Sequence, residues 1–77
     1  GEAEDELFPA AVRVILETGQ ASISMLQRRL RIGYTRAARL MDMMEARGFV
    51  GGHEGTKARA ILTSWEEYEE LFGNKEG

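Results

Sequence analysis

The sequence has no cysteine, and it has only one histidine and one proline among its 77 residues. Without cysteine, the chain can form neither a disulfide framework nor a thiolate metal site. His53 therefore lacks the partners that a zinc site requires, and we expect no metal. No apolar run approaches the ~20 residues that span a membrane, so we expect no membrane contact and a cytoplasmic localisation.

The chain is also too short for a deep catalytic cleft in addition to a scaffold, and we expect one domain. The stretch GGHEGTK lacks the Gly-Lys-Ser/Thr run of a phosphate loop, and no serine has a histidine partner placed to activate it. We therefore expect no enzyme activity, no catalytic residue and no cofactor. The polar ends, 1–5 and 73–77, are expected to be flexible linker or tail residues around a domain at 6–72.

Positive charge is concentrated in the middle of an acidic chain. Residues 1–20 and residues 61–77 each carry a net charge of −4, whereas residues 21–60 carry +5, within a total of −3. A basic centre between acidic ends indicates a local electrostatic footprint for a polyanion. The alternative is a solvated surface with chance clustering.

Hydrophobic periodicity predicts three helices in the first two thirds of the chain. The first runs from about Leu7 to Thr18, with Pro9 in its first turn and Gly19 as its stop. After an extended piece at 21–23, Ser24 is expected to cap a short helix at 25–30.

The third predicted helix begins after a turn in which Gly33 supplies the backbone freedom, and it spans Tyr34–Arg47 before Gly48. An advance of ~100° per residue divides this helix into two faces. The inward face holds Ala37, Leu40, Met41 and Met44. The outward face holds Thr35, Arg39, Asp42 and Ala46, with Arg36 and Met43 at its flank.

The remaining chain predicts a hairpin and a last helix. Phe49–Val50 and Arg59–Leu62 are expected to be short strands joined by a Gly-rich link. Ser64 and Glu67 match a capping box before a short terminal helix. The order predicts an α+β, mostly α, winged helix-turn-helix: a three-helix core, a two-stranded wing and a short C-terminal helix.

The second helix of such a pair normally enters the DNA major groove, which accounts for the basic centre. Arg39 can donate two hydrogen bonds to guanine, Asp42 can accept from cytosine, and Thr35 can bond to either base type. These three are the predicted base-reading residues. The predicted backbone contacts, which fix register without reading sequence, are Arg28, Arg29, Arg31, Arg36, Lys57 and Arg59.

Each assignment has an alternative. Arg39 and Asp42 could form a surface ion pair, which contributes well under ~1 kcal/mol. Thr35 could simply start the helix, and Arg28 and Arg29 could be solvated charges.

The stretch SISMLQRRLRIGYTRAARLMDMME closely resembles the C-terminal gamma domain of the FtsK/SpoIIIE DNA translocases, and the likeness extends from about Asp5 to Leu62. The resemblance implies a winged helix that recognises short, G-rich, polarised duplex sequences and so orients a translocase during chromosome segregation. It implies that Thr35, Arg39 and Asp42 read bases, with Arg36 beside them.

The resemblance also implies partners outside this chain. The family's ATPase motor belongs to the preceding domains, in a parent protein anchored in the membrane at the division septum. In some bacteria the gamma domain additionally contacts a tyrosine recombinase. A winged helix that binds a recombinase or another protein is therefore the alternative function.

Overall fold

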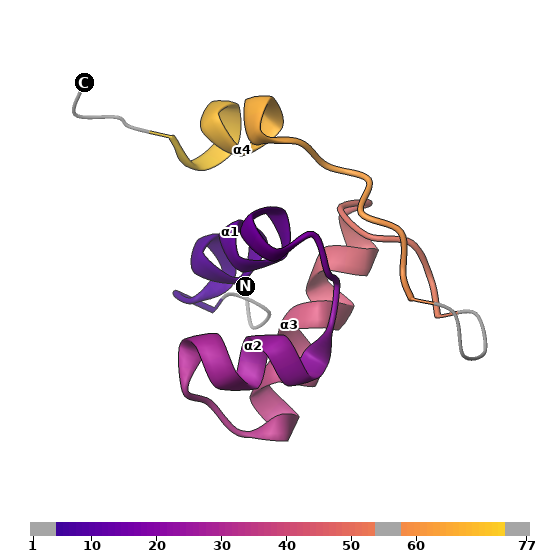
Figure 1. The fold of residues 1–77 in the computed structure, drawn as a ribbon. Coiled ribbons are helices and arrows are strands. Elements are labelled where there is room, and N and C mark those ends of the chain that lie inside the picture. Colours follow the sequence, from indigo (N-terminus) through magenta and orange to yellow (C-terminus); the bar gives the residue numbers. More distant parts are fainter. Residues whose placement is uncertain (1–4, 54–57, 74–77) are drawn as a thin grey trace.

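The computed structural model of the chain describes residues 5–53 and 58–73. Four helices lie in these ranges: α1 (Phe8–Thr18), α2 (Ile23–Leu30), α3 (Tyr34–Ala46) and α4 (Trp65–Phe72). Helix α1 packs against each of the other three, and α2 packs against α3 (Figure 1). The prediction of a mostly helical fold is confirmed for the described part of the chain.

Local chemistry at both ends fixes the limits of α1. Pro9 lies in the first turn, where its missing N–H would have no partner in any case. Gly19 ends the helix with a left-handed φ of 71°, and its N–H donates to the carbonyl of Ile15 at 2.9 Å. Both features confirm the prediction from the sequence that Pro9 lies in the first turn and that Gly19 ends the helix.

Helix α2 begins two residues before the predicted start. Its N-cap is Ser22, whose Oγ accepts a hydrogen bond from the Met25 N–H at 3.2 Å. The prediction that Ser24 caps this helix was wrong, because Ser24 already lies inside the first turn. Two serines two residues apart offer the same cap chemistry, and the register is set by burial of Leu26 against α1 and α3.

We expect Ser22→Ala to lower the free energy of unfolding by about 0.5–2 kcal/mol, since it removes the partner of one helix N–H. Thermal unfolding measures this loss, because each kcal/mol lowers the Tm of a domain of this size by about 4–8 °C. Ser24→Ala is the matched control and should stay within about 0.5 kcal/mol of wild type. Equal losses in the two variants would contradict the assignment of Ser22 as the cap.

The turn between α2 and α3 differs from the prediction at its central residue. Arg31 adopts the left-handed conformation with φ 58°, whereas Gly33 is extended with φ −79° and ψ 173°. The expectation that Gly33 supplies the reversal was therefore wrong. The Arg31 N–H and the Ile32 N–H both reach the carbonyl of Gln27, which closes the end of α2 and offsets the cost of the left-handed residue.

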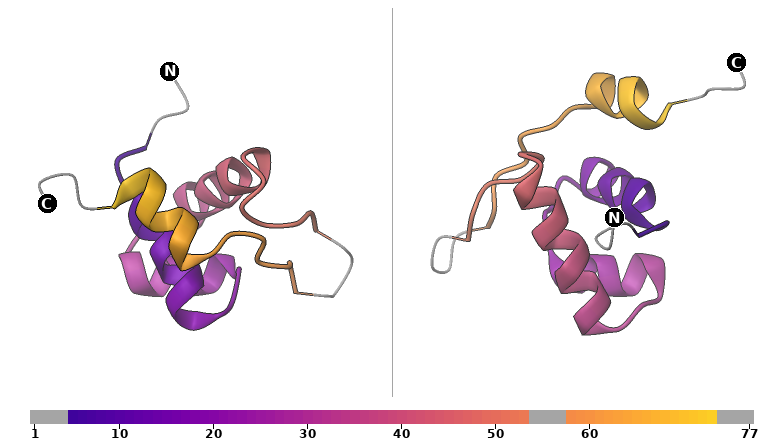
Figure 2. Two further views of the ribbon diagram at one scale, coloured as in Figure 1. Left: turned by 90° about the horizontal axis from the view of Figure 1, so that it is seen from above. Right: turned by 180° about the vertical axis from the view of Figure 1, so that it is seen from behind.

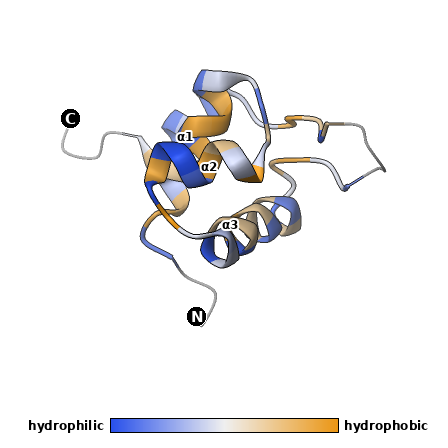
Figure 3. Cartoon of the chain, turned by 60° about the horizontal axis from the view of Figure 1, so that its bottom comes forward, coloured by the Kyte–Doolittle hydropathy of each residue, from blue (hydrophilic) through white to orange (hydrophobic). Residues whose placement is uncertain are grey.

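The core is formed by the inward faces of α1, α2 and α3. The predicted inward face of α3 is confirmed, since Ala37, Leu40, Met41 and Met44 are all buried. Figure 3 shows hydrophilic and hydrophobic residues alternating along this helix, as an amphipathic helix requires. One side of α3 is thus fixed against the core, and the other side is directed to solvent.

The predicted hairpin is present only as one isolated antiparallel bridge, between Val50 and Ile61. A second antiparallel bridge joins Arg59 to Ala21, in the segment between α1 and α2. The Gly51 N–H donates to the Ala60 carbonyl at 2.9 Å. The two predicted strands are not confirmed, since no continuous strand occurs between residues 5 and 53 or between 58 and 73. Residues 54–57, which include Lys57, lie outside the described residues.

The hairpin projects to one side of the helices, and α4 crosses α1 on the side away from α2 (Figure 2). Ser64 caps α4 as predicted, with its Oγ accepting from the Glu67 N–H at 3.2 Å. The Phe72 ring contacts the rings of Phe8 and Phe49 at centroid distances of 5.9 and 6.4 Å. This aromatic cluster attaches α4 to the core.

Candidate nucleic-acid interface

The outward face of α3 carries the three predicted base-reading side chains. Thr35, Arg39 and Asp42 are all exposed. Within residues 5–53 and 58–73, none of them forms a side-chain hydrogen bond or an ion pair, so the alternative Arg39–Asp42 pair is not formed. The face therefore presents a guanidinium, a carboxylate and a hydroxyl whose hydrogen-bonding groups are available. Their roles in reading bases stay predictions.

Arg36, at the flank of this face, is held by Asp5. The Arg36 Nε lies 3.0 Å from Asp5 Oδ2, and Nη2 lies 2.8 Å from Oδ1. Asp5 Oδ1 also accepts from the Leu7 N–H at 2.8 Å. The Asp5 side chain is only 7% exposed, whereas that of Arg36 is 41% exposed. Asp5, three residues before α1, is thus joined to the first turn of α3 across 31 positions of sequence.

These contacts change the acidity of both groups. The hydrogen bond from Arg36, followed by the one from the Leu7 N–H, lowers the pKa of Asp5 from 3.8 to about 2. The same hydrogen bond raises the pKa of Arg36 above its ordinary value. Folding therefore favours the ionised carboxylate.

A depressed carboxyl pKa stabilises the fold above the ordinary value of 3.8, and this contribution is lost as the pH falls towards 2. We expect the Tm to fall between pH 4 and 2, and we expect Asp5→Asn to show a shallower fall over that interval because it has no carboxyl to protonate. Thermal unfolding followed by circular dichroism at several pH values measures this. Parallel profiles for the two proteins would contradict the expectation.

Two other predicted backbone contacts are also paired. Arg29 lies 2.7 Å from Glu17 of α1, and both side chains are well exposed. Arg59 lies 3.0 Å from Glu45 Oε1 and donates to the Gly51 carbonyl at 3.3 Å. Only 12% of the Arg59 side chain is exposed. Arg59 thus joins the hairpin to the last turn of α3, and exposed pairs such as Arg29–Glu17 leave the cation available to a stronger anion.

Arg28 and Arg31 are exposed and form no ion pair with any other described residue. They lie at the end of α2 and in the turn that leads into α3. Both therefore lie close in sequence to the first turn of α3. Lys57, the remaining predicted contact, is not among the described residues.

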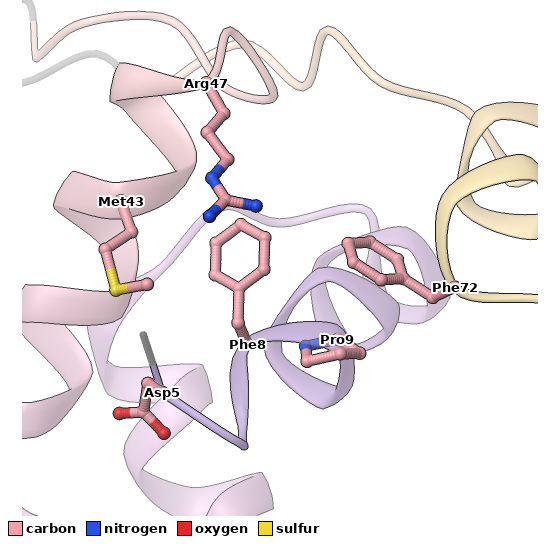
Figure 4. A pocket seen from close by; sticks show the side chains of 6 residues that line it. All are labelled: Asp5, Phe8, Pro9, Met43, Arg47 and Phe72. Atoms are coloured by element: carbon pink, nitrogen blue, oxygen red, sulfur yellow. The ribbon is translucent and has the colours of Figure 1, made fainter. Parts of the chain in front are cut away.

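Sequence reasoning gave no role to Arg47. Its guanidinium carbon lies 4.7 Å from the centroid of the Phe8 ring, a cation–π contact that covers one side of the aromatic cluster. Figure 4 shows this contact beside a pocket of about 170 Å3, lined by Asp5, Phe8, Pro9, Met43, Arg47 and Phe72. No local pattern marks Arg47, because its partner lies 39 positions away in sequence.

Residues 5–53 and 58–73 hold no cluster of three or more His, Cys, Asp or Glu side chains that could bind a metal ion. None of their helices has the length and apolar character of a membrane span.

The comparisons with known proteins identify the family. The Ftsk gamma domain family matches residues 2–64 of the chain. The chain belongs to this family. It is 55% identical over 74 residues, 96% of its length, to the DNA translocase FtsK of Caldanaerobacter subterraneus subsp. tengcongensis. It is 60% identical over 70 residues, 91% of its length, to the DNA translocase SpoIIIE of Bacillus subtilis.

The matched region is a small part of each relative. The chain covers 10% of the Caldanaerobacter protein and 9% of the Bacillus protein. It includes the gamma domain, which spans residues 2–64 of the chain. The resemblance seen in the sequence is thus confirmed for this domain.

Proposed function

We propose that this gamma domain binds duplex DNA in a sequence-specific manner, with the outward face of α3 in the major groove. The single observation that carries the proposal is the state of Arg39. It is exposed, lies on the outward face of a helix whose other side is buried, and has no ion-pair partner in the described part of the chain. An arginine in this position can donate two hydrogen bonds to guanine O6 and N7.

The hairpin between Phe49 and Leu62 acts as the wing of a winged helix in this proposal. It projects beside α3, and the Leu62 N–H donates to the Phe49 carbonyl at 2.8 Å. The Arg59–Glu45 contact holds it near the end of α3. In this proposal the described parts of the hairpin, 49–53 and 58–62, approach the DNA backbone or minor groove when α3 lies in the major groove.

The names of the relatives extend the proposal to the parent protein. Both relatives are described as DNA translocases, and the chain spans about a tenth of the length of each. We assign to the gamma domain the recognition of short, G-rich, polarised sequences, which orients an attached ATPase motor during chromosome segregation at the septum. The domain itself performs no catalytic step in this proposal.

Selection of bound duplexes from a random pool, at a fixed salt concentration, tests this function. We expect enrichment of a short, asymmetric, G-rich motif, because a guanidinium and a carboxylate on one helix face discriminate G·C from A·T pairs. The affinity for selected and scrambled duplexes is then compared at two salt concentrations, since the phosphate contribution depends on salt. A pool that remains random after selection would contradict the proposal.

One observation favours protein binding as a second function. Helix α4 exposes 44% of Trp65 and 50% of Leu71, and its surface carries Glu66, Glu69 and Glu70. Large apolar side chains exposed on one helix can contribute to a protein-binding patch. NMR titration separates the two functions: shifts confined to α4 on adding a tyrosine recombinase, with none on adding G-rich duplex, would favour protein binding alone.

A further inference from the structure

The contact between Asp5 and Arg36 has a geometry that bears on DNA binding. An arginine guanidinium has five N–H donors in a planar fork. Asp5 accepts from Nε and from one N–H of Nη2, at 3.0 and 2.8 Å. The two donors of Nη1 and the second donor of Nη2 remain. One donor of Nη1 and the second donor of Nη2 form the outer edge of the same plane, and that edge is itself suited to bidentate binding of a phosphate.

Asp5 is well fixed for such a role. Its Oδ1 accepts from the Leu7 N–H, and its own carbonyl accepts from the Phe8 N–H at 2.9 Å. The carboxylate is therefore anchored to the start of α1, which is packed into the core. An arginine held on one edge by an anchored carboxylate has few remaining rotamers, whereas a free arginine loses rotamer freedom when it binds.

We propose that Asp5 is a positioning residue for DNA recognition: it holds the Arg36 guanidinium so that its outer edge binds a phosphate beside the bases contacted from α3. The inference rests on the proposed function. Arg36 follows Thr35 on α3, and 41% of its side chain is exposed. A phosphate fixed at this point sets how deeply, and in which register, α3 lies in the groove.

The negative charge of Asp5 has a second, opposite effect. It lies beside the basic face and repels any duplex, whatever its sequence. Removing the charge should therefore strengthen binding to random DNA, while loss of the fixed guanidinium should weaken the preference for the selected site. If the ion pair had only a structural role, its removal would not raise the affinity for random DNA while lowering the preference for the selected site.

Glu6 provides a matched control for the charge. It neighbours Asp5 in sequence, is exposed, and forms no side-chain hydrogen bond or ion pair with the described residues. Glu6→Gln removes one negative charge near Arg36, as Asp5→Asn does, and it leaves the guanidinium held. Any difference between the two variants in their preference for the selected duplex therefore reports the positioning of Arg36 and not the change of charge.

The experiment measures the affinities of wild type, Asp5→Asn and Glu6→Gln for the selected duplex and for a scrambled duplex, by fluorescence anisotropy at fixed salt. We expect both variants to bind scrambled DNA at least as tightly as wild type. We expect only Asp5→Asn to lower the ratio of selected to scrambled affinity, by about 2- to 10-fold, the effect of freeing one long side chain. Equal ratios in the two variants would overturn the inference.

A double-variant comparison tests whether Asp5 acts through Arg36. In an Arg36→Gln background, the additional Asp5→Asn change should leave the ratio unaltered, and a further fall would overturn the inference. If Asp5→Asn fails to fold, Arg36→Lys takes its place, because lysine keeps the charge but lacks the fork. Arg36→Lys should lower the ratio of selected to scrambled affinity, while the salt dependence of the affinity stays as in wild type. An unchanged ratio would overturn the inference.

Failure of the proposed function gives a different result. Wild-type protein that binds selected and scrambled duplexes equally would overturn that function and this inference together. A wild-type preference that survives intact in Asp5→Asn would overturn this inference alone.

Discussion

Leu40→Ala is expected to lower the free energy of unfolding by about 2–5 kcal/mol, the largest stability effect that we predict for a single substitution. Leu40 is fully buried at 0% exposure, on the inward face of α3. Truncation removes apolar contacts and leaves a cavity between α3 and the helices packed against it. A loss of this size is a large fraction of the total stability of a small domain. Thermal and urea unfolding measure it.

Leu62→Ala is the matched control for this substitution. Leu62 is 59% exposed, so the same change of side chain should cost within about 0.5 kcal/mol. If the two variants lost equal stability, the assignment of the core to the inward face of α3 would be wrong. A Leu40→Ala protein that no longer folds at 25 °C would agree with the expectation.

Arg39→Ala is expected to weaken binding to the selected duplex by about 1–3 kcal/mol and to relax specificity at one base pair. The reason is the loss of a bidentate donor from the centre of the outward face. Because the side chain is exposed and has no ion-pair partner in the described part of the chain, stability should stay within about 0.5 kcal/mol of wild type. Anisotropy with the selected duplex and a set of single-pair variants measures the loss position by position.

Arg28→Ala controls for charge in this experiment. Arg28 is exposed on α2 and has no ion pair with another described residue. Its removal should weaken all duplexes alike and reduce the slope of log affinity against log salt by about 1. If Arg39→Ala lowered the affinity for every duplex equally, as this control should, the base-reading role of Arg39 would be rejected.

The features that the sequence predicted correctly depend on short-range periodicity. The inward face of α3 follows from a repeat of 3.6 residues, and the end of α1 follows from a single glycine. The start of α2 was misplaced because Ser22 and Ser24 have equal capping chemistry, and only packing of Leu26 separates them. The left-handed Arg31 was missed because a glycine two positions later is the stronger turn signal.

The ion pairs were beyond sequence reasoning for a different reason. Asp5 and Arg36 are 31 positions apart, and Arg59 and Glu45 are 14 apart. Only the packing of α1 against α3, and of the hairpin against the end of α3, brings these charges together. The sequence could thus mark the basic residues of the candidate interface, but it could not show which of them are already held by acids.

The placement of α4 has a consequence for how the domain meets DNA. Helix α4 packs against α1, on the side away from α2 (Figure 1), and carries Glu66, Glu67, Glu69 and Glu70. The exposed arginines Arg28, Arg31 and Arg39 lie on α2, in the turn after it and on α3. The charge of the domain is therefore distributed unevenly, with acidic side chains on α4 and basic ones on and between α2 and α3. Although the net charge of −3 has the same sign as DNA, this separation of charge exerts a torque near a polyanion and turns the acidic end away from it. Collisions would then be pre-oriented before any contact forms, over a range of about 10 Å at 0.1 M salt.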